Sequence, residues 1–131
     1  MPSTDPQTAL EEFERLAAAA DVNIDESAMN EEEAEDLADI RDLLCGAIQT
    51  GMLSVDADGC AVLAAPSGDI RFRIPLGEDL VIIANAKEGR RMEAMMRFIS
   101  SITGKDTRTI GKLPKREFTL TMRLAAFLSS L

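Results

Sequence analysis

The segment from Asp69 to Ile74 constrains the fold of this chain more than any other part of the sequence. It reads DIRFRI, with an apolar residue at every second position. This alternation is typical of a strand that is buried on one face and exposed on the other. Upstream, the pair Asp58-Gly59 stands between two β-prone runs and predicts a tight hairpin. We therefore expect a small antiparallel sheet across residues 52–74.

Two helices are expected before the sheet. Apolar residues recur at helical spacing within residues 5–20, and the acidic, turn-rich stretch DVNIDESAMN follows them. We predict that residues 1–28 form an acidic, mobile arm with a short helix, and that residues 29–131 form a single α+β domain. A second helix should begin near Asn30, a good N-cap residue, and should end at Gly51. Its predicted apolar stripe is Leu37, Ile40, Leu44, Ala47 and Ile48.

Helical patterns also follow the sheet. A helix from Arg90 to Gly104 carries an apolar face composed of Met92, Met95, Met96, Ile99 and Ile102. A final helix after Pro114 has two apolar lines, one with Phe118 and Met122 and the other with Leu120, Leu124 and Phe127. This apolar arc is wider than packing on a single neighbour requires. The sequence thus predicts an α+β fold with acidic N-terminal helices, a small antiparallel sheet with a hairpin, and a C-terminal helical hairpin.

The composition of the 131 residues limits the chemistry that the chain can perform. Histidine, tryptophan and tyrosine are all absent. Without histidine there is no usual neutral-pH general base, no imidazole metal ligand and no Ser-His or Cys-His nucleophile pair. Cys45 and Cys60 form no CxxC motif and lie among apolar residues, which favours buried free thiols. We expect a protein that is not an enzyme and that uses neither a cofactor nor a metal.

Charge is distributed unevenly along a chain whose formal net charge is −9. Residues 1–50 contain 14 acidic and 2 basic side chains, whereas residues 87–131 contain 4 acidic and 10 basic ones. Such asymmetry indicates either an acidic segment that folds back on a basic face or two surfaces for two partners. The start, MPSTDPQ, has no basic and apolar leader pattern, and no apolar run approaches the length that crosses a bilayer. We therefore expect a cytoplasmic protein without a membrane partner.

The basic stretch from Thr103 to Phe118 is the clearest candidate for a charged site. Its cations are Lys105, Arg108, Lys112, Lys115 and Arg116. A P-loop is excluded, because Asp106 follows Gly104-Lys105 and no glycine stands five residues earlier. A nucleic-acid site is the less favoured interpretation, since no aromatic residue is interleaved and the chain is acidic. A solvated basic turn, or one paired with the acidic half, is favoured.

The C-terminal half resembles the small tail assembly chaperones of long-tailed bacteriophages, the group related to those of phages Mu and P2. The resemblance covers residues 47–131 and rests on spacing and apolar pattern. Its segments are AIQTGMLSVDADG, IRFRIPLGEDL, FISSITG, KLPKREF and AAFLSSL. This chain has one extra residue between Pro75 and Asp79, a glutamate at Glu117 in place of the family's aspartate, and an acidic start without a family counterpart.

The resemblance implies a non-enzymatic assembly factor that acts in the cytoplasm of a bacterial host. Its partner would be the long, helical tape-measure protein of the phage tail. The expected partner-binding residues, on the last two helices, are Met92, Met95, Met96, Ile99, Phe118, Met122 and Phe127. In this interpretation the basic stretch is a hinge between those helices. A homo-oligomer is left open, and the alternative function is a nucleic-acid-binding phage or prophage accessory protein that uses the basic stretch.

Overall fold

The computed structural model describes residues 4–130 and confirms the α+β fold class. The elements, in chain order, are α1 (Pro6–Ala19), a 3-10 turn η1 (Glu26–Ala28), α2 (Glu31–Thr50), β1 (Leu53–Val55), β2 (Ala61–Ala65), β3 (Gly68–Phe72), α3 (Gly77–Ala84), α4 (Arg91–Thr103), α5 (Thr107–Gly111) and α6 (Lys115–Leu128). Residues 1–3 of the predicted arm and residue 131 lie outside the described residues.

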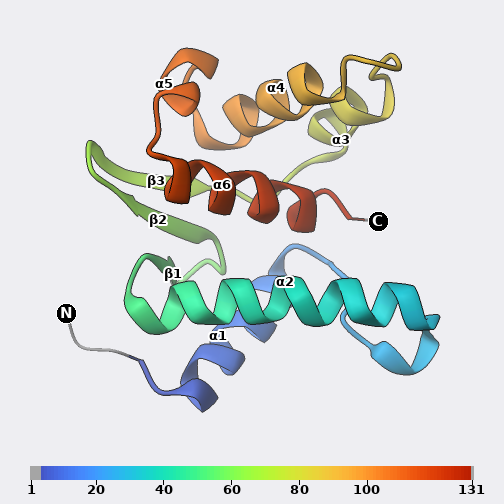
Figure 1. The fold of residues 1–131 in the computed structure, drawn as a ribbon, viewed down its shortest axis with the longest axis vertical. Helices are drawn as coiled ribbons and strands as arrows, with labels where there is room; N and C mark the ends of the chain where they lie inside the picture. Colours follow the sequence, from blue (N-terminus) through green and yellow to red (C-terminus); the bar gives the residue numbers. More distant parts are fainter. Residues whose placement is uncertain (1–3, 131) are drawn as a thin grey trace.

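Helix α6 lies between α2 and α4 and contacts both of them (Figure 1). Helix α1 packs against α2 on one side of the molecule, and α3 packs against α4 on the other. The chain directions of α2 and α6 are opposite, so the end of α2 lies near the start of α6 (Figure 1). This arrangement gives α6 neighbours on several sides.

The N-terminal and C-terminal signals of α2 act as the sequence predicts. The side chain of Asn30 accepts a hydrogen bond from the backbone N–H of Glu33 at 2.8 Å, as an N-cap does. Gly51 has the left-handed φ of 84° and ends the helix. Buried side chains follow the predicted stripe at Leu37, Ile40, Leu44 and Ile48, while Ala47 is half-buried.

The sheet has strand order β1-β2-β3, and both strand pairs are antiparallel. The first turn is longer than the predicted two-residue turn, because pairing ends at Val55 and Ala61. The carboxylate of Asp56 stabilises this turn by accepting backbone hydrogen bonds from Asp58 at 2.9 Å and Cys60 at 3.0 Å. A second hairpin at Pro66-Ser67, which the sequence analysis missed, joins β2 to β3.

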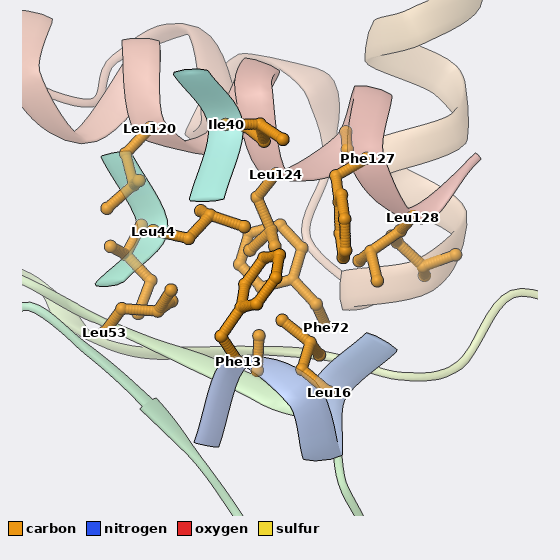
Figure 2. Packing of buried hydrophobic residues seen from close by; sticks show 14 of the residues in the cluster. Phe13, Leu16, Ile40, Leu44, Leu53, Phe72, Leu120, Leu124, Phe127 and Leu128 are labelled. Atoms are coloured by element: carbon orange, nitrogen blue, oxygen red, sulfur yellow. The ribbon is translucent and has the colours of Figure 1, made fainter. Parts of the chain in front are cut away.

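The core contains side chains from both ends of the chain. Phe13 and Leu16 of α1 point into the same space as Leu44 of α2 and Leu124 of α6 (Figure 2). The ring centroids of Phe13 and Phe127 are 5.3 Å apart. The core therefore extends across the boundary predicted at residue 28, and α1 is part of the domain rather than of a separate arm. Phe13 is a large apolar side chain, which explains why burying it is favourable.

The basic stretch from Thr103 to Phe118 contains a helix that the sequence analysis did not predict. Asp106 begins α5 by accepting a hydrogen bond from the backbone N–H of Thr109 at 2.7 Å. Ile110 anchors the helix, because its side chain is fully buried. The predicted hinge is thus a short, packed helix between α4 and α6. Pro114 is the N-cap of α6, which begins at Lys115.

Gly59 is required by both its conformation and its surroundings. Its φ is 83°, and a Cβ atom placed there would lie 2.5 Å from the Cβ of Ala19 at the end of α1. Left-handed strain and this overlap together should make Gly59→Ala cost about 2–3 kcal/mol of unfolding free energy. Urea denaturation would measure the loss. Gly89→Ala is the matched control, because Gly89 has a φ of 86° but open space beside it; equal losses in the two variants would contradict the close approach.

Candidate partner-binding site

The structure does not bring the predicted partner-binding residues together on one surface. Ile99 of α4 and Phe127 of α6 are buried in the core. Four others are half-buried and pack against the core, namely Met95, Met96, Phe118 and Met122. Met92, at the start of α4, is 60% exposed. The predicted apolar face of α4 is thus largely the face that packs on the core, with Ile102 also buried, but the prediction missed the fully buried Phe98.

The wide apolar arc of α6 has a structural explanation. Because α6 lies between α4 and α2 and also contacts β2, it has apolar neighbours around most of its circumference. Leu120 and Leu124 are buried by these contacts. The sequence analysis counted a single neighbour for this helix and inferred a surplus of apolar width. The remaining elements of the domain cover that surplus.

Exposed large apolar side chains occur elsewhere in the described part of the chain. Leu76, at the N-cap of α3, is 56% exposed, and Val81 of α3 is 51% exposed. Residues 4–130 contain four exposed large apolar side chains. Three of them, Leu76, Val81 and Met92, belong to the α3–α4 helix pair, and the fourth is Leu43 of α2. The sequence analysis did not include α3 among the candidate binding elements. The apolar run LVIIANA, from Leu80 to Ala86, was the signal that could have indicated this surface.

A cleft of about 520 Å³ lies between α3 and α4. Its apolar lining includes Val81, Ile82 and Ala94, and its basic lining includes Arg90 and Arg97. Glu93 also lines the cleft and pairs with Arg90 across 3.3 Å. We call this cleft the α3–α4 surface; Leu76 and Met92 lie outside its lining. Chemically, it can bury apolar groups while its arginines attract carboxylates.

A buried carboxylate, Asp79, fixes the position of α3. Asp79 is 1% exposed, and its oxygens accept hydrogen bonds from the guanidinium of Arg73 at 2.7 and 2.9 Å. It also accepts from the hydroxyl of Ser101 on α4 and from the backbone N–H of Leu76. The Arg73 hydrogen bonds, with those from Ser101 and Leu76, hold the pKa of Asp79 well below its ordinary value despite burial. This network ties α3 to α4 and to the end of β3.

The five predicted basic residues are all exposed. Lys105, Arg108 and Lys112 lie on or beside α5, and Lys115 and Arg116 begin α6. None of the five forms an ion pair with another described residue, so the expected pairing with the acidic half is not present there. The aromatic residues of the chain are five phenylalanines, and none is exposed. The basic stretch thus offers charge without a stacking surface.

Metal and membrane sites were also assessed over residues 4–130. No group of three or more cysteine, aspartate and glutamate side chains is arranged there to hold a metal ion. No helix in this part of the chain combines the length and apolarity needed to cross a bilayer. Cys60 is buried and Cys45 is half-buried, and both thiols are free. Burial raises the pKa of the Cys45 thiol above its ordinary value.

Comparison of the chain with protein-family models, with curated proteins and with solved structures gave no match. No relative therefore indicates a function for this chain, and its own surfaces are the structural basis for one.

Proposed function

We propose that this protein is a non-enzymatic assembly chaperone of phage origin that binds an amphipathic helix of a partner protein on the α3–α4 surface. The observation that carries the proposal is the exposed apolar side chain of Val81 in an open cleft with apolar and basic lining. Val81 lines an open cleft, and most other large apolar residues of the described chain are buried or half-buried. A helix laid into the cleft would cover Val81 and neighbouring apolar groups, as in helix-in-groove recognition.

Charge defines the chemistry of the partner helix. Lys87, Arg90 and Arg97 line the cleft together with a single acidic residue, Glu93. Carboxylates beside the apolar stripe of the partner would complement these cations and increase its association rate. The partner helix should therefore carry an apolar stripe flanked by aspartate or glutamate.

The resemblance to tail assembly chaperones supports a tape-measure protein as this partner. Such a protein is long and helical and needs protection of its apolar surface before assembly. The acidic N-terminal half of this chain, with 14 acidic side chains in residues 1–50, would keep the complex soluble. The protein would then act in the cytoplasm of the bacterial host.

Co-expression with the tape-measure protein encoded beside this chain tests the proposal. Val81→Glu should weaken the complex roughly tenfold or more, because it places a carboxylate where apolar contact is required. Its unfolding midpoint should stay near that of the wild type, since the Val81 side chain is exposed. Ala57→Glu is the control, because it adds the same charge in the exposed turn after β1. A wild-type chain that forms no complex, or a Val81→Glu variant that binds as well as the wild type, would contradict the proposal.

The alternative function is a nucleic-acid-binding accessory protein. It is favoured by one observation, the exposure of five basic residues on α5 and the start of α6 without ion pairs to described residues. Titration with duplex and single-stranded DNA at two salt concentrations separates the alternatives. Salt-sensitive binding that disappears on charge reversal at Lys105, Arg108 and Lys112 would favour the alternative. The chaperone proposal predicts no such binding.

A further inference from the structure

An open groove of about 800 Å³ lies between α2 and α6, away from the α3–α4 surface. Leu43, Gly46 and Ala47 of α2 line it opposite Thr119 and Leu120 of α6. We call it the α2–α6 groove. Leu43 is 36% exposed here, although most other large apolar residues of the described chain are covered. The groove therefore combines an apolar ridge at Leu43 with small residues beside it.

Gly46 is not explained by packing within the domain. It lies inside α2, where glycine costs about 1 kcal/mol relative to alanine. A Cβ atom added to Gly46 would meet no heavy atom of residues 4–130 within 4 Å. No described side chain therefore requires a glycine at this position. With Ala47 it leaves a shallow hollow into which a side chain from outside can enter.

Unpaired charges of opposite sign lie at the two ends of the α2–α6 groove. On α2, the exposed carboxylates of Glu35, Asp39 and Asp42 precede Gly46 at helical spacing. Because α2 and α6 are antiparallel, the exposed Lys115 and Arg116 lie at the opposite end, beside Thr50 (Figure 1). None of these five side chains forms an ion pair with another residue in the described range. The carboxylate row and the basic pair are both parts of this chain.

We propose that the α2–α6 groove binds a second copy of this chain, with the two α2 helices antiparallel and crossing midway between Leu43 and Gly46. Leu43 of each copy then enters the hollow at Gly46 and Ala47 of the other. At 1.5 Å rise per residue, Asp42 and Asp39 lie roughly 4 and 8 Å before the crossing. Asp39 therefore reaches the level of Thr50 in the second copy, beside the Lys115–Arg116 pair, and Asp42 lies less than one helical turn short of that level.

Such an interface is symmetric, because each copy contributes the same ridge, hollow, carboxylates and cations. A parallel arrangement would instead place the carboxylates of one copy over those of the other, which is unfavourable. The complementarity comes entirely from groups of this chain, and this favours a second copy over another protein. The inference goes beyond the proposed function and does not depend on it.

Sedimentation analysis of the full chain with charge-swapped variants tests the interface. The wild type should dimerise in the micromolar range and dissociate more readily at high salt. Lys115→Glu with Arg116→Glu should weaken the dimer roughly tenfold or more, and so should Asp39→Lys with Asp42→Lys. All four substitutions in one chain should restore the dimer, because the charges are again complementary. The proposal would be overturned if the wild type were monomeric at about 100 µM. It would also be overturned if the variant with all four substitutions dimerised as weakly as the two double variants.

Gly46→Leu supplies a second test that does not depend on charge. Leucine would fill the hollow, and the chain should become monomeric while its unfolding midpoint stays equal or rises, because leucine favours helix. A dimer of unchanged affinity in this variant would overturn the seating of Leu43 in the hollow at Gly46. Monomeric variants should still bind the tape-measure protein through the α3–α4 surface. A loss of dimer and a loss of partner binding are therefore distinguishable.

Discussion

Phe13→Ala should destabilise the protein by about 3–5 kcal/mol, the range typical of phenylalanine truncation in a core. Phe13 is 1% exposed and packs against Phe127 from the other end of the chain. Its removal leaves a cavity among side chains of α1, α2 and α6 (Figure 2). Urea denaturation followed by far-UV circular dichroism measures the loss. It should appear as a lower midpoint of one cooperative transition.

Leu10→Ala is the matched control for this prediction. Leu10 lies on the same helix but is half-buried, so its truncation should cost clearly less. The comparison also tests whether α1 belongs to the domain. If Phe13→Ala lowers the unfolding free energy by under about 1 kcal/mol, α1 is not held in the core. The mobile arm predicted from the sequence would then be the better description of α1.

Asp79→Asn should lower the free energy of unfolding by about 3 kcal/mol at pH 7. The substitution removes a buried charge that accepts hydrogen bonds from Arg73, Ser101 and the N-terminus of α3. The folded pKa of Asp79 is depressed below the ordinary value of about 3.9. The carboxylate therefore stabilises the fold above that value. This stabilisation is lost as the pH falls from about 5 through the folded pKa.

The wild type should thus lose more stability than Asp79→Asn between pH 5 and pH 2, and the two curves should converge in acid. Denaturant titrations at several pH values would show this. Glu78→Gln is the control, because Glu78 is an exposed carboxylate in the same turn of α3. Its pH dependence should follow that of the wild type. Parallel curves for the wild type and Asp79→Asn would contradict the role assigned to Asp79.

The same network connects stability to the proposed function. Asp79 holds α3 against α4 and β3, and α3 supplies Val81 to the α3–α4 surface. A helix pair that is fixed before the partner arrives loses less conformational entropy on binding. The proposed partner-binding and dimer surfaces lie on different helix pairs, so one copy could use both at once. A dimer would then present two partner-binding surfaces.

Local signals determined much of the fold. The Asn30 N-cap, the Gly51 terminus and the stripe from Leu37 to Ile48 act through groups a few residues apart, so sequence spacing suffices to identify them. The alternation around Ile70 likewise identified β3, although the strand ends at Phe72. Beyond that point the backbone N–H of Arg73 donates to the carbonyl of Ile102 on α4. Pairing with a helix end cannot be read from alternation.

Tertiary contacts decided which apolar side chains remained accessible. The sequence by itself established an α+β chain, its charge asymmetry and the approximate position of most helices, because these depend on local periodicity and composition. It could not show that α6 lies between α2 and α4, that Phe13 joins the core, or that α3 keeps Val81 exposed. A helical pattern reports how many apolar residues share a face. The number of neighbours that cover this face depends on elements distant in sequence. For this reason the candidate binding surface lies on α3 and not on α6, where the sequence analysis expected it.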